Sequence, residues 1–145
     1  MESKMRVIYC GFFIEKAKFE RFFEPKLAKA VDFPHITTAF RPSGTELHED
    51  ALGEKLRVRV VAYGNNGRNE GIKVEFVEGS AKAKSIFEQI RVPHITISVA
   101  EDAKPVDTAE LDFEDLPNGA EFELRYGWYC ADRQRGASIY FGGHR

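Results

Sequence analysis

The tetrapeptide Pro-His-Ile-Thr occurs twice in this sequence of 145 residues, at Pro34–Thr37 and again at Pro93–Thr96. Its two histidines, His35 and His94, are 59 residues apart. One His-x-Thr match carries little information, but a repeated tetrapeptide in similar surroundings is a strong signal. Side chains alternate across a strand, so each histidine shares a face with the threonine two residues later. If the two strands face one another, two imidazoles and two hydroxyls converge on one point.

Such a set of groups suits phosphoester chemistry. An unperturbed imidazole titrates near ~6.5, so one of His35 and His94 can be neutral while the other is protonated at neutral pH. The neutral ring can take a proton from water or from a ribose hydroxyl, and the protonated ring can give one to the leaving oxygen. The hydroxyls of Thr37 and Thr96 can donate to the non-bridging phosphate oxygens, where charge builds in the transition state. This scheme requires no metal and no cofactor.

Similar elements precede both motifs. Apolar residues at helical spacing predict an amphipathic helix before the first motif, and Pro25 predicts a kink or break within it. Ser80 is a good N-cap for a helix before the second motif. The predicted elements are a strand at Met5–Phe13, a helix at Glu15–Ala30 and a strand at Pro34–Phe40, then a strand at Ile72–Val77, a helix at Ser80–Ile90 and a strand at Pro93–Val99.

The repeated order of elements predicts an α+β fold in which residues 1–145 form a single bilobal domain. We expect two pseudo-symmetric lobes, each with an antiparallel-rich sheet and an outer helix, and His-x-Thr strands that line a central groove. Alternating residues predict a hairpin through the turn at 64–71, and a second hairpin is expected at 120–131 and 137–142. The segment 100–119 is acidic and is expected to be irregular.

The motifs at His35–Thr37 and His94–Thr96 resemble those of the 2H phosphoesterase superfamily, whose LigT-like members act on RNA 2′,3′-cyclic phosphates and 2′–5′ linkages. The motifs and their strand–helix surroundings cover about two thirds of the chain. The resemblance implies that His35 and His94 are the catalytic pair and that Thr37 and Thr96 bind phosphate. It implies a metal-independent phosphodiesterase acting on a 2′,3′-cyclic phosphate or a 2′–5′-linked RNA or nucleotide.

Other functions stay open at this point. The superfamily includes cyclic phosphodiesterase domains of tRNA ligases and phage enzymes that linearise cyclic-nucleotide immune signals. The alternatives are therefore a phosphodiesterase of cyclic oligonucleotide signals or of a nucleotide-sugar cyclic phosphate, and a non-catalytic nucleotide- or RNA-binding module of the same fold. For hydrolysis of a cyclic phosphate we expect His94 to be the base and His35 the acid, and the roles exchange if a 2′-hydroxyl attacks first.

Three further residues are candidates for substrate binding. Tyr129 lies on the same face of its predicted strand as charged residues, so it is the better candidate for stacking on a nucleobase. Tyr126 and Trp128 have the opposite parity and are expected in the core. Tyr9 is another candidate wall residue, and Arg41, just beyond the first motif, can reach a phosphate.

Composition limits the partners. The chain has 21 basic and 23 acidic residues, which argues against a protein that tracks a long polyanion. Residues 100–119 alone carry 1 basic and 7 acidic side chains, so the rest of the chain is mildly positive and suits a small phosphorylated nucleotide or an RNA end. No apolar run predicts a membrane span, and no signal-peptide pattern or Cys-rich framework occurs. We expect a cytoplasmic protein that does not bind membranes, with Cys10 and Cys130 reduced and buried; the oligomeric state is left open.

Overall fold

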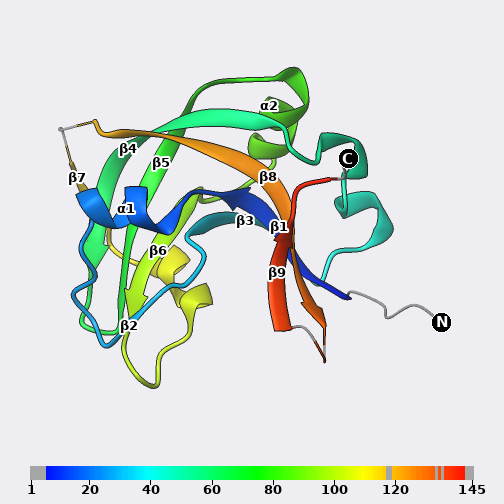
Figure 1. The fold of residues 1–145 in the computed structure, drawn as a ribbon. Helices are drawn as coiled ribbons and strands as arrows, with labels where there is room; N and C mark the ends of the chain where they lie inside the picture. Colours follow the sequence, from blue (N-terminus) through cyan, green and yellow to red (C-terminus); the bar gives the residue numbers. More distant parts are fainter. Residues whose placement is uncertain (1–5, 117–118, 133, 135, 143–145) are drawn as a thin grey trace.

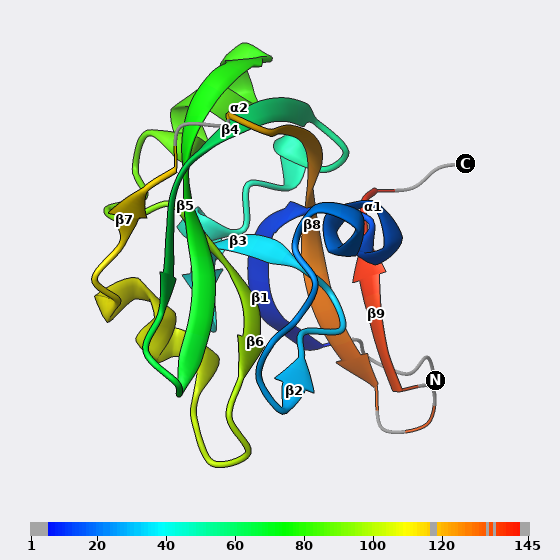
Figure 2. The same ribbon diagram turned by 90° about the vertical axis from the view of Figure 1, so that its left-hand side faces the viewer.

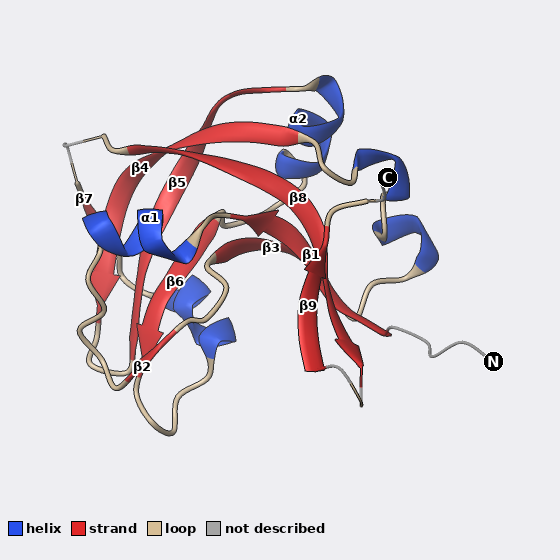
Figure 3. Cartoon of the chain, in the orientation of Figure 1, coloured by secondary structure: helices blue, strands red, loops and turns tan. Residues whose placement is uncertain are grey.

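The computed structural model describes residues 6–116, 119–132, 134 and 136–142. Strands predominate and the helices are few and short (Figure 3). The chain order is β1 (Arg6–Phe13), α1 (Lys16–Phe22), β2 (Lys29–Ala30), β3 (His35–Phe40), the 3₁₀ turns η1 (Gly44–Glu46) and η2 (Glu49–Ala51), β4 (Lys55–Asn65), β5 (Asn69–Gly79), α2 (Ala81–Phe87), β6 (His94–Val99), the 3₁₀ turn η3 (Pro105–Glu110), β7 (Glu114–Asp115), β8 (Glu121–Asp132) and β9 (Gly136–Tyr140). The predicted α+β class is confirmed at this level.

All these strands belong to one sheet. Its order is β2-β6-β5-β4-β8-β1-β3, with β7 beside β4 and β9 beside β8, and every pair is antiparallel. The prediction of a separate sheet in each lobe therefore differs from the structure. The physical reason is that the long strands β4 and β8 pair with each other (Figure 1), which joins β5 and β6 to β1 and β3 in the order of one sheet.

The sheet curls so that strands far apart in this order approach each other. β3 is at one end of the path and β6 is second from the other end, yet the two strands are in contact (Figure 2). The histidines lie on one face of these strands, and on the other face Ile36 and Ile95 pack into the core with no exposed surface, although Phe40 at the end of β3 is 63% exposed. The predicted alternation within both motifs is confirmed. Burying each of these two isoleucine side chains stabilises the fold by about 1.5–3 kcal/mol.

The two helices are shorter than the sequence pattern predicts. α1 ends at Phe22 and not at Ala30, because Pro25 has no backbone N–H and also disfavours helical backbone in the residue before it. The expected break at Pro25 is thus confirmed, and the predicted continuation beyond it is wrong. The hydroxyl of Ser80 caps α2 by accepting from the backbone N–H of Ala83 at 3.2 Å, as predicted.

A buried carboxylate fixes the segment that returns from α1 to the sheet. Glu70 on β5 is 1% exposed and accepts three hydrogen bonds, from the backbone N–H of Lys26 at 3.0 Å, from Ser98 Oγ at 2.6 Å and from the Tyr63 hydroxyl at 2.5 Å. Burial, together with this carboxylate, raises the pKa of Tyr63 to about 12. Ser98 Oγ in turn accepts from the backbone N–H of Leu27 at 3.1 Å. These bonds hold the return segment against β5 and β6, where β2 pairs with β6.

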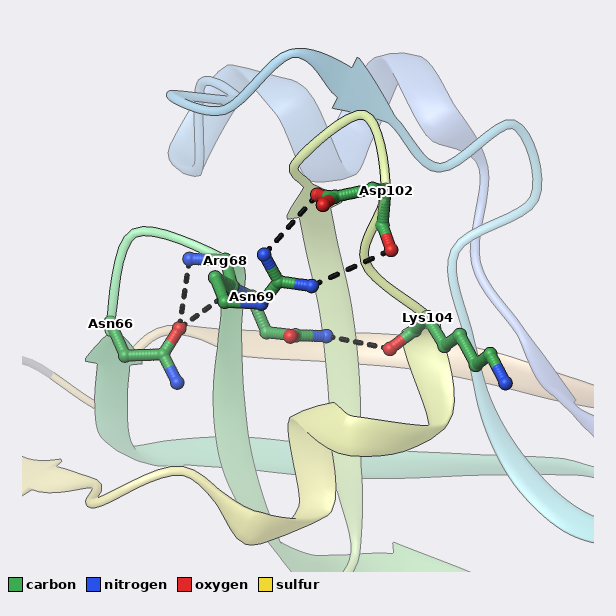
Figure 4. A network of polar contacts seen from close by, with 5 residues as sticks. All are labelled: Asn66, Arg68, Asn69, Asp102 and Lys104. Atoms are coloured by element: carbon green, nitrogen blue, oxygen red, sulfur yellow. Dashed lines mark hydrogen bonds and ion pairs between the residues drawn. The ribbon is translucent and has the colours of Figure 1, made fainter.

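The start of the acidic segment is attached to the β4–β5 turn (Figure 4). Asn66 Oδ1 accepts from the backbone N–H groups of Arg68 at 2.9 Å and Asn69 at 2.8 Å, which closes the turn. Arg68 pairs with Asp102 at 3.2 Å, and Asn69 Nδ2 donates to the Lys104 carbonyl at 2.8 Å. The segment predicted to be irregular therefore carries η3 and β7 and begins at a defined place on the sheet.

Both cysteines are free and buried, as predicted. Tyr126 lies in the core with no exposed surface and Trp128 is partly buried; the Tyr126 hydroxyl and Trp128 Nε1 both donate to the Leu47 carbonyl. None of the helices that the structure describes has the length and apolarity needed to cross a bilayer.

Candidate active site

The first histidine stands at the start of β3, held by two hydrogen bonds. His35 Nδ1 lies 2.6 Å from the carbonyl oxygen of Phe33, and His35 Nε2 lies 2.9 Å from Thr37 Oγ1. A carbonyl oxygen can only accept, so Nδ1 carries the proton and donates. In the neutral ring Nε2 then accepts from the Thr37 hydroxyl. The reactive lone pair of His35 is therefore on Nε2, on the same face of β3 as Thr37.

The second histidine is held in the same way at the start of β6. His94 Nδ1 lies 2.7 Å from the Val92 carbonyl, two residues before it, so its Nδ1 also donates and its Nε2 is the free nitrogen. The proline before each histidine also has an equivalent backbone contact: the Pro34 carbonyl accepts from the N–H of Ile14 and the Pro93 carbonyl from the N–H of Val74, both at 3.1 Å. Both imidazoles are thus fixed in one tautomer by the same local contact.

The electrostatics of His35 depend on burial and on the second histidine. Burial lowers the pKa of His35 from its ordinary value to about 4, the Phe33 carbonyl acts in the opposite direction, and the charge of His94 lowers it further. His35 is therefore neutral in the free protein at physiological pH. The two histidines are 59 residues apart in sequence, but they stand at the starts of two strands, β3 and β6, that are in contact.

The two threonines differ in their surroundings. Thr37 is exposed, and its hydroxyl bonds to His35 Nε2. Thr96 is 9% exposed, and its hydroxyl donates to Thr108 Oγ1 of η3 at 2.9 Å. Thr108 also accepts from Asn69 Nδ2 at 3.1 Å. The two motifs therefore present unequal hydroxyls: that of Thr37 is open to solvent, and that of Thr96 is already bonded to η3.

A glycine lies opposite each threonine in the neighbouring strand. Gly11 of β1 pairs with Thr37, and Gly71 of β5 pairs with Thr96. A Cβ atom on Gly11 would lie 2.5 Å from the Ile36 carbonyl oxygen and 3.5 Å from the His35 ring, while one on Gly71 would lie 2.4 Å from a Thr108 methyl group. Both glycines allow a close approach that any side chain would prevent. A lone glycine inside a strand pattern is the sequence signal for such an approach.

An aromatic stack flanks His35. The Tyr9 ring lies between the His35 ring at 4.4 Å and the Tyr129 ring at 4.7 Å, and the two tyrosine rings are nearly parallel at 9°. Phe13 contacts both His35, at 5.3 Å, and Tyr9, at 5.9 Å, and Phe33 meets Tyr129 edge-on at 5.7 Å. Burial and the neighbouring Tyr129 raise the pKa of Tyr9 above its ordinary value, so its hydroxyl, 3.3 Å from His35 Nδ1, stays neutral. Sequence reasoning selected Tyr9 and Tyr129, and the structure brings both to His35.

Arg41 is not brought to the histidines. It follows β3 at the end opposite His35, and the six residues of that strand span about 20 Å. Its backbone is left-handed, with φ of 51°, and its guanidinium lies 5.4 Å above the Phe40 ring. Sequence reasoning in turn missed Thr108, because it lies in the segment expected to be irregular and meets Thr96 only through the tertiary fold. Within the part of the chain that the structure describes, no group of three or more His, Cys, Asp or Glu side chains could hold a metal ion.

No protein-family model matches this chain, and no curated protein matches it.

Proposed function

We propose that this protein is a metal-independent phosphodiesterase that acts on a 2′,3′-cyclic phosphate or a 2′–5′-linked RNA or nucleotide substrate through two-histidine acid–base catalysis. One observation carries the proposal: His35 and His94 come from separate copies of one motif and share one tautomer, each with Nδ1 donating to the carbonyl two residues earlier. Because Nδ1 holds its proton in this bond, Nε2 is the nitrogen of each ring that is available to take up or release a proton. A purely structural histidine gains little from such a repeated arrangement.

Hydrolysis of a cyclic phosphate then needs one proton transfer at each histidine. The neutral base takes a proton from water as the water oxygen forms a bond to phosphorus. The P–O bond to the 2′- or 3′-oxygen breaks, and the protonated acid gives its Nε2 proton to that oxygen. The product is a phosphomonoester with a free hydroxyl on the neighbouring carbon, and one water is consumed. A hydroxyl donor beside the phosphorus stabilises the charge that builds on the non-bridging oxygens.

The surroundings of His35 favour it as the base. Its low pKa keeps Nε2 unprotonated at neutral pH, and Thr37 already donates to that atom, as a bound water would. His94 is then the acid. This reverses the assignment expected from the sequence for hydrolysis and agrees with the one expected when a 2′-hydroxyl attacks first.

The phosphate contacts follow the unequal threonines. The exposed hydroxyl of Thr37 can turn from His35 Nε2 to a phosphate oxygen without loss of any other bond. Thr96 would have to give up its bond to Thr108 inside a nearly closed environment. We therefore place the stronger phosphate contact at Thr37, with Thr96 and Thr108 as support for the second strand.

We further propose that β1–α1–β3 and β5–α2–β6 are two pseudo-symmetric lobes whose His-x-Thr strands line one groove. Three matched features support this: the antiparallel pairing of the outer strands with β3 and β6, the glycine opposite each threonine, and the seven-residue helix in each unit. The exposed part of the Tyr9–Tyr129 stack would then contact the nucleobase next to the reacting phosphate.

Turnover with EDTA present tests the proposal. Wild type, His35→Ala and His94→Ala are assayed with 2′,3′-cyclic nucleotides, a 2′–5′ dinucleotide and cyclic dinucleotides. We expect EDTA-resistant hydrolysis of one of the first two classes, lowered about 10²-fold or more by either substitution. His48→Asn is the matched control, because His48 has left-handed backbone that asparagine tolerates and is not in the site.

Each other outcome has a distinct meaning. Activity confined to cyclic dinucleotides assigns the protein to cyclic oligonucleotide signals. Nucleotide binding without any turnover favours a non-catalytic module. Loss of turnover with EDTA, or full activity in both alanine variants, contradicts the two-histidine mechanism. Circular dichroism of each variant distinguishes loss of chemistry from loss of fold.

A further inference from the structure

An open groove of about 850 Å³ begins beside His35 and extends away from it. It lies between α1 with the segment after it and the strands β4 and β8. Neither histidine lines it, but two residues that touch His35 do: Phe13, whose ring contacts the imidazole, and Phe33, whose carbonyl accepts from it. The groove is thus a separate surface that meets the candidate active site at these two residues.

Strand register connects the groove to the catalytic histidine. His35 pairs with Phe13, Phe13 with Arg125 and Arg125 with Lys55, so these four residues form one row across β3, β1, β8 and β4. Paired residues project from the same face of a sheet, and neighbouring strands lie about 4.8 Å apart. The Cα atoms of Arg125 and Lys55 are therefore about 10 and 14 Å from that of His35. Two cationic side chains, Arg125 and Lys55, thus lie in one row that begins at His35.

Basic side chains exceed acidic ones in the lining. The basic residues are Lys16, Lys18, Arg21, Lys55, Arg57 and Arg125, and the acidic ones are Glu15, Asp32, Glu121 and Glu123. The ion pairs of Lys16, Lys18, Lys55 and Arg57 are 3.5–3.9 Å long and exposed, and such pairs contribute little stability that a phosphate would have to replace. Across the described residues, Arg21 and Arg125 have no carboxylate within ion-pair distance, and Arg125 instead lies 4.4 Å above the Phe141 ring.

Exposed aromatic side chains line the same groove as these cations. Phe22 on α1 is 59% exposed and Phe33 is 37% exposed, and both are in its lining. Exposed apolar side chains that gather at one groove indicate a contact surface. Cations at intervals with exposed rings between them are the pattern that binds single-stranded nucleic acid without reading its sequence.

We propose that this groove binds the single-stranded RNA that precedes the reacting phosphate, so that the substrate is the end of an oligonucleotide about three to four nucleotides long in contact with the protein. The inference rests on the proposed function for the identity of the reacting group. A free mononucleotide would occupy only the histidine site and leave the groove empty. A short contact agrees with the net charge of −2 of the whole chain, which does not favour binding along a long polyanion.

Two readouts test the groove. In the first, fluorescence anisotropy measures binding of a labelled RNA hexamer ending in a 3′-phosphate. Wild-type affinity should fall about 15-fold between 0.05 and 0.2 M salt, because three phosphate contacts give a slope near −2. The double variant Lys55→Gln/Arg125→Gln should bind about tenfold more weakly, with a shallower slope. Lys82→Gln/Lys84→Gln removes the same charge from α2, outside the groove, and should bind as wild type does.

In the second readout, kcat/KM is compared for 2′,3′-cyclic-phosphate substrates of one to six nucleotides. We expect wild-type kcat/KM to rise with length and level off at about four nucleotides, and the ratio of tetramer to monomer to approach one in the groove variant. Equal kcat/KM for all lengths in wild type, or a groove variant that binds the hexamer like the α2 control, overturns the inference while the proposed function stands. Absence of turnover on every substrate refutes the proposed function, and anisotropy still decides the groove.

Discussion

The two threonines of the repeated motif should respond differently to the same substitution. Threonine to valine keeps the shape and removes the hydroxyl. Thr37 is exposed and bonded only to His35 Nε2, whereas Thr96 is 9% exposed and donates to Thr108. The catalytic cost should therefore fall on Thr37→Val and the stability cost on Thr96→Val.

The magnitudes follow from these surroundings. Loss of a donor to the charged phosphate oxygens lowers kcat by about 10²-fold in comparable sites, so we expect that loss for Thr37→Val. An exposed hydrogen bond contributes little net stability, and Thr37→Val should unfold within about 0.5 kcal/mol of wild type. Thr96→Val leaves the buried Thr108 oxygen with one donor fewer, at a cost of about 1–2 kcal/mol. For a chain of this length that lowers the Tm by about 3–6 °C.

Steady-state hydrolysis of a 2′,3′-cyclic nucleotide and thermal unfolding by circular dichroism measure both effects on one preparation. Thr108→Val is the internal control: it breaks the same bond from the other side and also removes an acceptor of Asn69 Nδ2, so it should lower the Tm by at least as much as Thr96→Val. Our reasoning is refuted if Thr96→Val loses at least as much kcat as Thr37→Val while its Tm is unchanged. That result would mean that both hydroxyls contact the phosphate equally and that the bond to Thr108 contributes nothing.

Three further predictions concern the elements that hold the site. The folded pKa of His35 is about 4 and its unfolded value near 6.5, so the neutral ring contributes stability at pH 7 that is lost as pH falls through about 4. In urea unfolding, wild type should therefore lose about 3 kcal/mol more between pH 7 and pH 4 than His35→Gln, and equal losses would contradict the burial of the ring. Gly11→Ala places a Cβ 2.5 Å from the Ile36 carbonyl oxygen and should lower the free energy of unfolding in urea by about 2 kcal/mol. Gly44→Ala is the control, because nothing lies within 4 Å of its Cβ, and it should change that free energy by less than about 0.5 kcal/mol. A Gly11 variant as stable as the Gly44 variant would show that β1 and β3 can move apart without cost. Ser80→Ala removes the N-cap of α2 and should lower the Tm by about 3 °C in calorimetry, while an unchanged Tm would mean that the cap is not formed in solution.

The strands of the site could be predicted because their signals are local. In both His-Ile-Thr motifs a buried isoleucine stands between two polar residues, and the proline before each histidine marks the strand start. The capped start of α2 is equally local, since Ser80 bonds to a backbone group three residues away. In each case the physical cause lies within a few residues of the pattern that reveals it.

The features that were missed depend on contacts distant in sequence. Glu70 falls in the segment 64–71 that the sequence predicts as a turn, yet it lies on β5 and is buried, because Lys26, Tyr63 and Ser98 supply donors from three other segments. The single sheet follows from the pairing of β4 with β8, across a long stretch of chain. Thr108 contacts Thr96 only because η3 folds back over β6.

The repeat creates two histidines that are alike in tautomer but unlike in environment, and this difference is what acid–base chemistry needs. His35 and His94 share the contact from Nδ1 to a carbonyl two residues earlier, so the spacing of the motif determines which nitrogen can react. The surroundings then differ, because β3 ends the sheet beside Tyr9 and Phe13, whereas β6 lies between β5 and β2 with η3 packed against it. Burial lowers the pKa of His35 and keeps this ring neutral at pH 7. Under the proposed mechanism, the unequal packing of a duplicated motif is therefore what assigns the role of base to His35, a distinction that the sequence repeat alone does not make.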